Sequence, residues 1–306
     1  MKSFLITVDT EGDNQWKMWN GEETTTENAK HIPRFQSLCE EYGFKPVYLM
    51  TWEMADDAML VAYLKNKAQS GLCEIGMHLH AWSSPPAYDL PRKYNGNPYI
   101  TEYSQEIMYE KMRLLTEHLE NRFEVKPISH RAGRWASNPA MFDVLTELGY
   151  KVDCSVVSGW NASQITGQST NVGFDYSKSP KKAYWAKQGL LEVPMIVERF
   201  RKFSGKTLRE KISRIVKGRE TWLRPAMSDS TEMMRMLSKD ENDYAMFMIH
   251  STELMPGGSP YFKTAEDVER EYGIIKNVFD DAQSKYTGAS LEEYFNAYSC
   301  DIQQQV

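Results

Sequence analysis

Two histidines at adjacent same-face positions are the clearest chemical feature of the sequence. His78 and His80 close the apolar run Glu74–His80, which is typical of a β-strand. Side chains two residues apart in a strand point to the same face and lie about 6.6 Å apart along it. Such a pair can converge on one metal ion, whereas a single histidine in a strand is more often structural. The pair predicts a metal site that needs an oxygen ligand and an open position for water.

Three carboxylates follow the first apolar run of the chain, at Asp9, Glu11 and Asp13. An acidic turn around Gly12 is one interpretation, but three acids directly after a buried strand favour a functional role. One carboxylate can bind metal while another acts as a base, because their surroundings can push their pKa values apart. The residues alone leave open which carboxylate has which task.

Alternating strands and helices must position these groups. The apolar, β-rich runs are Phe4–Asp9, Pro46–Trp52, Glu74–His80, Pro127–Arg131, Tyr150–Val156, Leu191–Val197 and Tyr244–His250. The segments with helical spacing are Asn28–Tyr42, Asp56–Gln69, Glu102–Phe123, Pro139–Leu148, Ser230–Leu237, Thr264–Ala282 and Ser290–Tyr298. This order predicts parallel strands with right-handed crossovers. No glycine-rich phosphate loop follows the first strand, so we expect a closed or nearly closed (β/α) barrel.

Polar residues gather at the carboxyl ends of the predicted strands, which form the active face of a (β/α) barrel. Most of the strands deliver an ionisable group to this face: Asp9, His78 with His80, Arg131, Asp153 and His250. Thr51 and Trp52 end the second strand. This joint pattern predicts an active site more strongly than any single residue does.

The composition restricts the partners. A net charge of -6 argues against nucleic-acid binding, which needs a basic surface. No window approaches 18 apolar residues, and the first apolar run is too short for a signal peptide. We therefore expect a cytoplasmic protein without a membrane span.

The segment Arg199–Arg224 departs from the pattern, with ten Lys or Arg and only two acids. Leu208, Ile212, Ile215 and Val216 are spaced almost as on a helix, so we predict an inserted helix within an insertion at about 199–229. It is either an ordinary solvated surface helix or a basic lid that meets an anionic glycan, a lipid carrier or a membrane surface.

Five segments resemble, in order, the motifs of the polysaccharide deacetylases with NodB homology, carbohydrate esterase family four. They are residues 6–13, 74–82, 130–135, 150–156 and 247–254, and the sequence is most similar to the branch associated with bacterial lipopolysaccharide O-antigen gene clusters. The resemblance covers most of the chain. It implies one distorted (β/α)7 barrel domain over residues 1–306.

The resemblance also implies roles for individual residues. Asp9 matches the catalytic base, Arg131 the arginine that orients it, and His250 the general acid. His78 matches the first metal histidine. Residues at groove-lining or supporting positions, where substrate binding is implied, are Trp52, Trp82, Arg134, Trp135 and Asp153.

Two departures from the family pattern concern the metal. The family has a second aspartate where this chain has Thr10, and a second histidine where it has Trp82. Glu11 or Asp13 must then supply the carboxylate ligand and His80 the second imidazole. A divalent ion is the implied cofactor, with Zn²⁺ expected.

The implied activity is removal of an N-acetyl or O-acetyl group from a sugar of a bacterial surface polysaccharide or its precursor. The substrate would be an acetylated amino sugar, free or linked to a nucleotide or lipid. Two alternatives stay open. The altered ligand spacing fits a catalytically degenerate sugar-binding homologue, and Glu253 with Asp9 could serve another barrel hydrolase such as a glycoside hydrolase.

Overall fold

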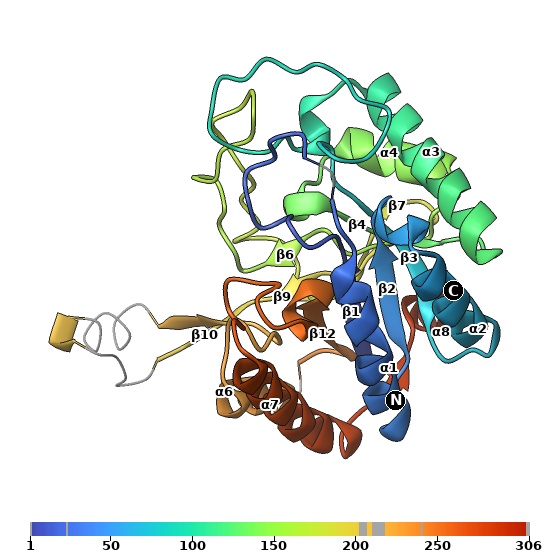
Figure 1. The fold of residues 1–306 in the computed structure, drawn as a ribbon. Helices are drawn as coiled ribbons and strands as arrows, with labels where there is room; N and C mark the ends of the chain where they lie inside the picture. The colour runs from blue at the N-terminus through green and yellow to red at the C-terminus, as the bar shows by residue number, and fades with distance from the viewer. Residues whose placement is uncertain (1, 23, 202–206, 210–217, 240, 304–306) are drawn as a thin grey trace.

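A curled, largely parallel β-sheet forms the centre of the molecule (Figure 1), seen in a computed structural model that describes residues 2–22, 24–201, 207–209, 218–239 and 241–303. The strand order is β12-β1-β2-β3-β4-β5-β8-β7, and β13 also pairs with β1. The strands are β1 (Ser3–Thr10), β2 (Pro46–Met50), β3 (Glu74–Leu79), β4 (Ser129–Ala132), β5 (Val152–Asp153), β7 (Tyr184–Lys187), β8 (Leu190–Glu192), β12 (Tyr244–His250) and β13 (Thr287–Ala289). Within this sheet only β7 and β8 pair antiparallel. The predicted α/β class and distorted (β/α)7 barrel are confirmed.

Helices connect the strands and cover the outside of the curled sheet (Figure 1). They are α1 (Ile32–Glu41), α2 (Ala58–Gln69), α3 (Gln105–Phe123), α4 (Pro139–Glu147), α6 (Ser230–Leu237), α7 (Ala265–Gln283) and α8 (Leu291–Gln303). Short 3-10 turns are η1 (Glu27–His31), η2 (Met54–Asp56), η3 (Ile100–Glu102), η4 (Gly133–Trp135) and η5 (Ser251–Leu254). Side-chain caps explain several helix starts: Asp57 accepts from Leu60 N–H at α2, and Thr264 forms a capping box with Asp267 at α7.

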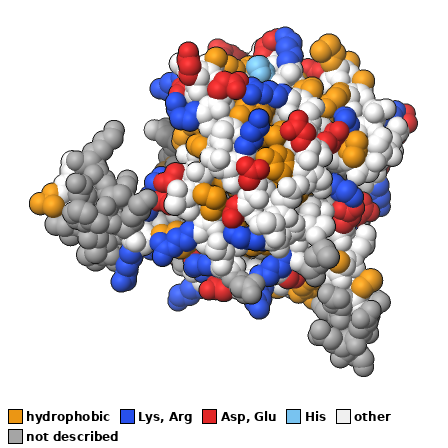
Figure 2. All heavy atoms as spheres, turned by 90° about the horizontal axis from the view of Figure 1, so that it is seen from below, with side chains coloured by type: hydrophobic (Ala, Val, Ile, Leu, Met, Phe, Trp, Pro, Cys, Tyr) orange, Lys and Arg blue, Asp and Glu red, His pale blue; other side chains and the backbone are white. Residues whose placement is uncertain are grey.

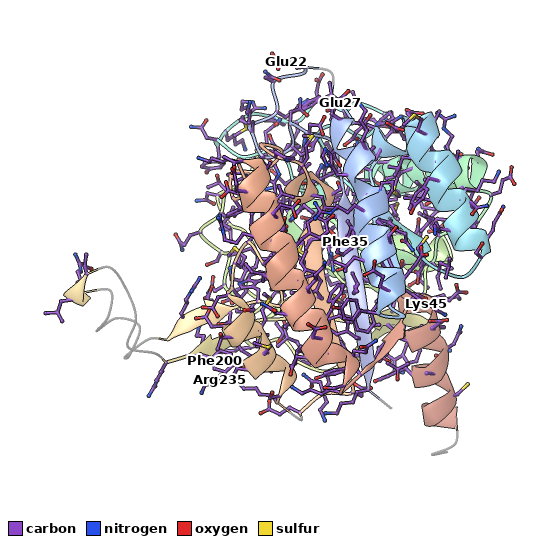
Figure 3. All side chains as sticks on the ribbon, turned by 60° about the horizontal axis from the view of Figure 1, so that its bottom comes forward. Glu22, Glu27, Phe35, Lys45, Phe200 and Arg235 are labelled. Atoms are coloured by element: carbon purple, nitrogen blue, oxygen red, sulfur yellow. The ribbon has the colours of Figure 1, made fainter. Side chains whose placement is uncertain are left out.

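Strand β1 runs through the core with every side chain after Ser3 buried, as expected for a parallel strand covered on both faces. Aromatic rings pack beside it. The ring centroid of Phe4 lies 4.8 Å from that of Phe44 and 5.8 Å from that of Phe279, and Phe35 of α1 joins the cluster (Figure 3). This packing fixes the strand whose end carries Asp9.

Two predicted strands are interrupted. The run 150–156 gives only β5, followed by β6 (Val157–Ser158), and the run 191–197 gives β8 and then β9 (Met195–Ile196). β6 and β9 pair with each other in a separate two-stranded sheet. A continuous apolar run does not reveal such a break, because the residues on both sides of it are buried.

The prediction of a helix across Arg199–Arg224 is wrong at both ends. There β10 (Glu198–Phe200) and β11 (Arg219–Thr221) form an antiparallel pair (Figure 1). Phe200 is buried under the guanidinium of Arg235, 4.4 Å from the ring centre, which favours a strand here over an exposed helix (Figure 3). Residues 202–206 and 210–217, with most of the predicted helix, lie outside the described residues.

The surface seen from below Figure 1, at the amino ends of the central strands, carries interspersed acidic and basic side chains (Figure 2). Within the described part of the chain, no helix is long and apolar enough to cross a membrane.

Candidate metal and catalytic site

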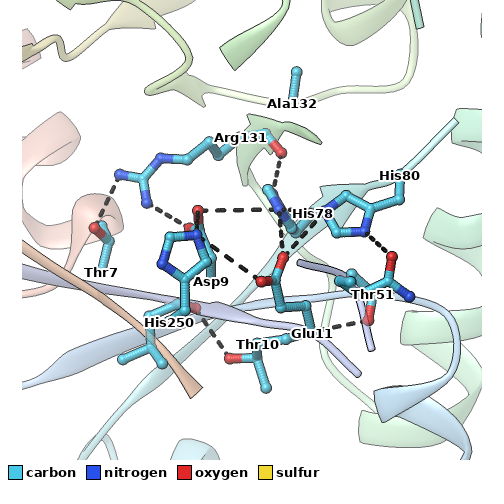
Figure 4. A network of polar contacts seen from close by, with 12 residues as sticks. Thr7, Asp9, Thr10, Glu11, Thr51, His78, His80, Arg131, Ala132 and His250 are labelled. Atoms are coloured by element: carbon cyan, nitrogen blue, oxygen red, sulfur yellow. Dashed lines mark hydrogen bonds and ion pairs between the residues drawn. The ribbon is translucent and has the colours of Figure 1, made fainter. Parts of the chain in front are cut away.

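Four strand ends bring the predicted site residues together (Figure 4). In the parallel registers, Asp9 of β1 lies beside His250 of β12, and His78 of β3 lies beside Arg131 of β4. Glu11 follows β1, where Ser251 Oγ accepts a hydrogen bond from its backbone N–H at 3.1 Å. Residues from both ends of the chain therefore meet at one mouth of the barrel.

Glu11, His78 and His80 form a group whose ligand atoms all lie within 4.8 Å of one another. The two Nε2 atoms are 3.1 Å apart, and Glu11 Oε2 lies 3.2 Å from His80 Nε2 and 3.8 Å from His78 Nε2. Ligands about 2.0–2.1 Å from a tetrahedral ion lie roughly 3.3 Å from one another. Two imidazoles and one carboxylate also match the donor types of catalytic zinc sites, so the residues fit a divalent ion.

Hydrogen bonds turn both histidines toward Glu11. The carbonyl of Arg131 lies 2.8 Å from His78 Nδ1, and Gln15 Oε1 lies 3.1 Å from His80 Nδ1. Both oxygens can only accept, so each Nδ1 carries the proton and each Nε2 presents a lone pair. Gln15 Oε1 is itself fixed by the indole N–H of Trp82 at 2.8 Å.

The protonation states that burial favours for His78, His80 and Glu11 also suit the binding of a cation. Burial lowers the pKa of His78 to about 3 and that of His80 to about 4, so both rings are neutral at pH 7. Burial raises the pKa of Glu11 to about 8. Two neutral imidazole lone pairs 3.1 Å apart repel each other, and a divalent ion between them would remove this repulsion and displace the Glu11 proton.

Asp13 lies elsewhere. Its carboxylate accepts hydrogen bonds from Thr25 Oγ1 at 2.6 Å and from the backbone N–H of Glu27 and Asn28 at 2.8 and 3.0 Å. These contacts fix the start of η1. Of the two carboxylates left open by the sequence, the structure groups Glu11, and not Asp13, with the histidines.

Asp9 is ionised and held by Arg131. Arg131 Nη1 donates to Asp9 Oδ1 at 2.5 Å, while its other nitrogens donate to Thr7 Oγ1 at 2.9 Å and to the carbonyl of Cys154 at 3.1 Å. Burial alone would raise the pKa of Asp9, but the Arg131 charge and hydrogen bond together with the neighbouring His78 and His250 outweigh burial and hold that pKa well below its ordinary value. The second oxygen, Oδ2, is left to face the histidines.

His250 faces Asp9 from β12, with Nε2 3.7 Å from Asp9 Oδ2 and 3.9 Å from Glu11 Oε1. Its Nδ1 lies 2.9 Å from Arg224 Nη2, and Trp16 packs against the ring with centroids 4.8 Å apart. Sequence reasoning missed Gln15, Trp16 and Arg224. Gln15 and Trp16 come shortly after the acidic motif, and this closeness in the sequence could have identified them. Arg224 was assigned only to the basic segment.

Three tryptophans predicted for substrate binding surround the mouth. Trp82 stacks on His80 at 4.3 Å, and Trp135 lies 4.7 Å from the guanidinium of Arg131. Trp52 stacks on His118 at 4.0 Å and lines an open groove of about 490 Å³. All three remain candidates for sugar contacts.

The other two predicted substrate contacts, Asp153 and Arg134, make hydrogen bonds within the protein. Asp153 is fully buried and accepts from His130 Nδ1 at 2.7 Å. Arg134 donates to the carbonyls of Asn97 and Thr166, joining two loops. Arg134 and Trp135 both have left-handed backbones, with φ of 59° and 60°, which turn the chain sharply after β4.

Comparison with known proteins places this site in a known fold. Neither a protein-family model nor a curated protein sequence matches the chain. A structure from Mycobacterium smegmatis, described as a candidate polysaccharide deacetylase, matches with a TM-score of 0.52 and 14% identity over 98% of this chain and 91% of that chain. A 4-alpha-glucanotransferase from Thermococcus litoralis matches with a TM-score of 0.52 and 13% identity, over 97% of this chain but 38% of that chain.

A candidate polysaccharide deacetylase involved in O-antigen biosynthesis in Bordetella bronchiseptica matches with a TM-score of 0.40 and 12% identity, over 96% of this chain and 90% of that chain. At these identities the likeness concerns the fold, and function depends on the site. The chain thus has the fold of the polysaccharide deacetylases, the family that its motifs resemble.

Proposed function

We propose that the chain is a metal-dependent deacetylase that removes the acetyl group of an acetylated amino sugar. The observation that carries this proposal is the buried Glu11–His78–His80 donor set, which faces an ionised Asp9 held by Arg131. Metal ligands next to a separate carboxylate base suit the hydrolysis of an acyl group.

His78 Nε2, His80 Nε2 and Glu11 would hold the ion, with Zn²⁺ the proposed metal. When bound, a divalent ion supplies Lewis acidity, which acidifies water and polarises a carbonyl oxygen. Asp9 accepts the proton of the attacking water at Oδ2, and Arg131 keeps Asp9 ionised until then. His250 faces the reacting centre from the end of β12, and its Nε2–H donates a hydrogen bond there.

The groove beside the site supports a sugar substrate. Trp19 and Trp52 line it, and Glu53, also in its wall, accepts a hydrogen bond from Gly12 N–H next to the ligand Glu11. Stacking on His118 fixes the ring of Trp52, which suits an aromatic surface for a sugar ring. The proposal includes a nucleotide-linked or lipid-linked sugar, a cytoplasmic location, and contact of the basic segment 199–224 with an anionic carrier or membrane surface.

Acetate release from N-acetylglucosamine oligosaccharides and from UDP-N-acetylglucosamine tests the function directly. We expect release that is lost on chelation and restored by Zn²⁺ or Co²⁺. Asp9→Asn should lower kcat about 10²–10⁴-fold, the usual contribution of a positioned acid or base. Retention of wild-type acetate release by both Asp9→Asn and His250→Ala would contradict the scheme.

Two other functions are less well supported. The likeness to a glucanotransferase suggests a glycosidic-bond enzyme as one alternative, but its candidate pair, Glu253 and Asp9, would then need one protonated carboxyl. Burial alone would raise the pKa of Glu253, whereas Arg224 and His250 lower it to about 2, and Asp9 is ionised as well. Release of reducing sugar without acetate would favour that class. A purified protein with no affinity for Zn²⁺ or Co²⁺ would favour a degenerate sugar-binding homologue.

A further inference from the structure

Arg224 contacts His250 on the side of the ring away from Asp9. Backbone contacts along the edge of strand β12 determine the position of Arg224. The carbonyl of Leu223 accepts from Met248 N–H of β12 at 3.0 Å, so residues 222–224 run along the outer edge of that strand. The carbonyl of Arg224 then accepts from Met227 N–H at 3.0 Å, which turns the chain away. Arg224 is 7% exposed and reaches the end of β12 at His250.

One nitrogen of Arg224 serves two acceptors. Nη2 lies 2.5 Å from Glu253 Oε1 and 2.9 Å from His250 Nδ1, and its two hydrogens suffice for one bond to each. A guanidinium nitrogen only donates, so His250 Nδ1 must accept and the ring proton lies on Nε2. The competing arrangement, in which Nδ1–H donates to Glu253 Oε1, would span 3.7 Å, beyond hydrogen-bond length.

We propose that Arg224 is a positioning residue that fixes His250 as a neutral imidazole with its proton on Nε2, directed at the reacting centre. This inference rests on the proposed deacetylase function and assigns the chemical form of one of its residues. The titratable and charged groups facing the ring are Asp9 and Glu11 near Nε2, and Arg224 and Glu253 near Nδ1. Glu253 is already paired with Arg224, so it does not draw a proton onto Nδ1.

The consequence is that His250 acts as a hydrogen-bond donor instead of a source of protons. The water oxygen bonds to the acetyl carbon, and the water proton passes to Asp9 Oδ2. The carbon–nitrogen bond then breaks, and Asp9 gives that proton to the leaving nitrogen. His250 Nε2–H stabilises the carbonyl oxygen as it becomes negative and ends unchanged, as a neutral histidine can do when its surroundings keep it so.

Nitrogen NMR of the histidine rings tests the proposal without reference to activity. In ring-labelled protein the six histidines give separate patterns, and His250→Gln identifies the pattern of residue 250. We expect an unprotonated Nδ1 and a protonated Nε2 in the wild type. Arg224→Met should lose this preference, whereas Arg224→Lys, which can still donate, should retain part of it. A protonated Nδ1 in the wild type, or an unchanged pattern in Arg224→Met, would overturn the proposal.

Removing Arg224 alone leaves Glu253 as an unpaired buried charge, which threatens folding. The double variant Arg224→Met/Glu253→Gln removes both charges and keeps the test available if the single variant does not fold. Glu271→Gln is the matched control, because Glu271 lies behind the pair and burial with the Glu253 charge raises its pKa to about 10. It should keep the wild-type nitrogen pattern, and loss of the pattern there would count against a specific role of Arg224.

Kinetics provide the second readout. Arg224→Met should lower kcat at least tenfold with KM little changed, and Arg224→Lys should recover part of kcat, because the donor acts on the reacting oxygen and not on substrate binding. An unchanged kcat in a folded Arg224→Met enzyme would refute the role. Absence of acetate release in the wild type would contradict the proposed function, while the nitrogen pattern would still decide the tautomer.

Discussion

Two arginines, Arg131 and Arg224, lie on opposite sides of the candidate site, and they form different hydrogen bonds with its residues. Arg131 is fully buried, and each of its nitrogens donates to a defined acceptor, with Asp9 the reacting carboxylate among them. Arg224 binds a carboxylate that does not react, Glu253, and touches the reacting histidine with the same nitrogen. Its Nε has no hydrogen-bond partner among the described residues. Arg131 therefore stabilises a charge, whereas Arg224 selects the position of a proton.

The Arg131 side should be the less tolerant of change. Arg131→Ala leaves the Asp9 carboxylate buried and unpaired, and we expect a loss of about 3–5 kcal/mol in the free energy of unfolding. Urea unfolding at pH 7 measures this loss. The double variant Arg131→Ala/Asp9→Asn should regain most of it, and an equally unstable double variant would show that packing, not charge, sets the cost.

The same pair predicts how stability depends on pH. Because the folded pKa of Asp9 lies below its unfolded value near 3.9, the ion pair contributes stability above that pH and loses it as the pH falls toward the folded pKa. Wild-type stability should therefore fall more steeply below about pH 4 than that of Asp9→Asn. Parallel pH curves for the two proteins would contradict an ionised Asp9.

The proposed metal ligands lie on the Arg131 side. Of two carboxylates close together in the sequence, Glu11 would bind the metal, whereas Asp13 supports the start of η1. Glu11→Gln should weaken Zn²⁺ binding by more than about 100-fold, because it removes a ligand. Asp13→Asn should leave that affinity unchanged and lower stability by about 0.5–2 kcal/mol, the value of a helix-start contact. Calorimetric titration with Zn²⁺ measures both, and the reverse order of affinities would assign the ligand to Asp13.

Gln15 supports the proposed metal ligand His80. Gln15→Leu removes the acceptor that fixes His80 Nδ1–H and the indole of Trp82, so we expect a loss of Zn²⁺ affinity of about 10–100-fold. The same titration measures it. Wild-type affinity would show that stacking between Trp82 and His80 suffices to orient the ring.

A second pH dependence of stability belongs to the Arg224 side. The carboxyl of Glu271 has no partner among the described residues, and burial raises its pKa to about 10. Because the folded pKa exceeds the unfolded one, the stability linked to this proton is full below about pH 4.3 and declines as the pH rises toward 10. Glu271→Gln should thus gain about 1.4 kcal/mol per pH unit relative to wild type between pH 5 and 8. A constant difference over that interval would mean that Glu271 is ionised.

The sequence was sufficient for the parts of the site that follow strand periodicity. Asp9, His78, Arg131 and His250 lie at strand ends because apolar runs stop there, and parallel pairing makes those ends neighbours. The choice between Glu11 and Asp13 was not predictable, since it depends on the path of the backbone beyond β1. Arg224 was missed because it lies in irregular structure after β11, where no strand end marks it as a site residue. The apolar spacing at Leu208 and Ile212 suggested one helix for a region that begins and ends as strands.

The pairing of β1 with β12 has a consequence for how the molecule assembles. The ligands Glu11, His78 and His80 are encoded within the first third of the chain, yet Thr7 and Glu11 bond to residues 240 positions further on. Contacts between such distant segments form slowly, because a long loop must close first. During synthesis the amino-terminal strands emerge long before β12. We expect a folding intermediate that can already capture metal but gains His250, and with it activity, only when β12 docks.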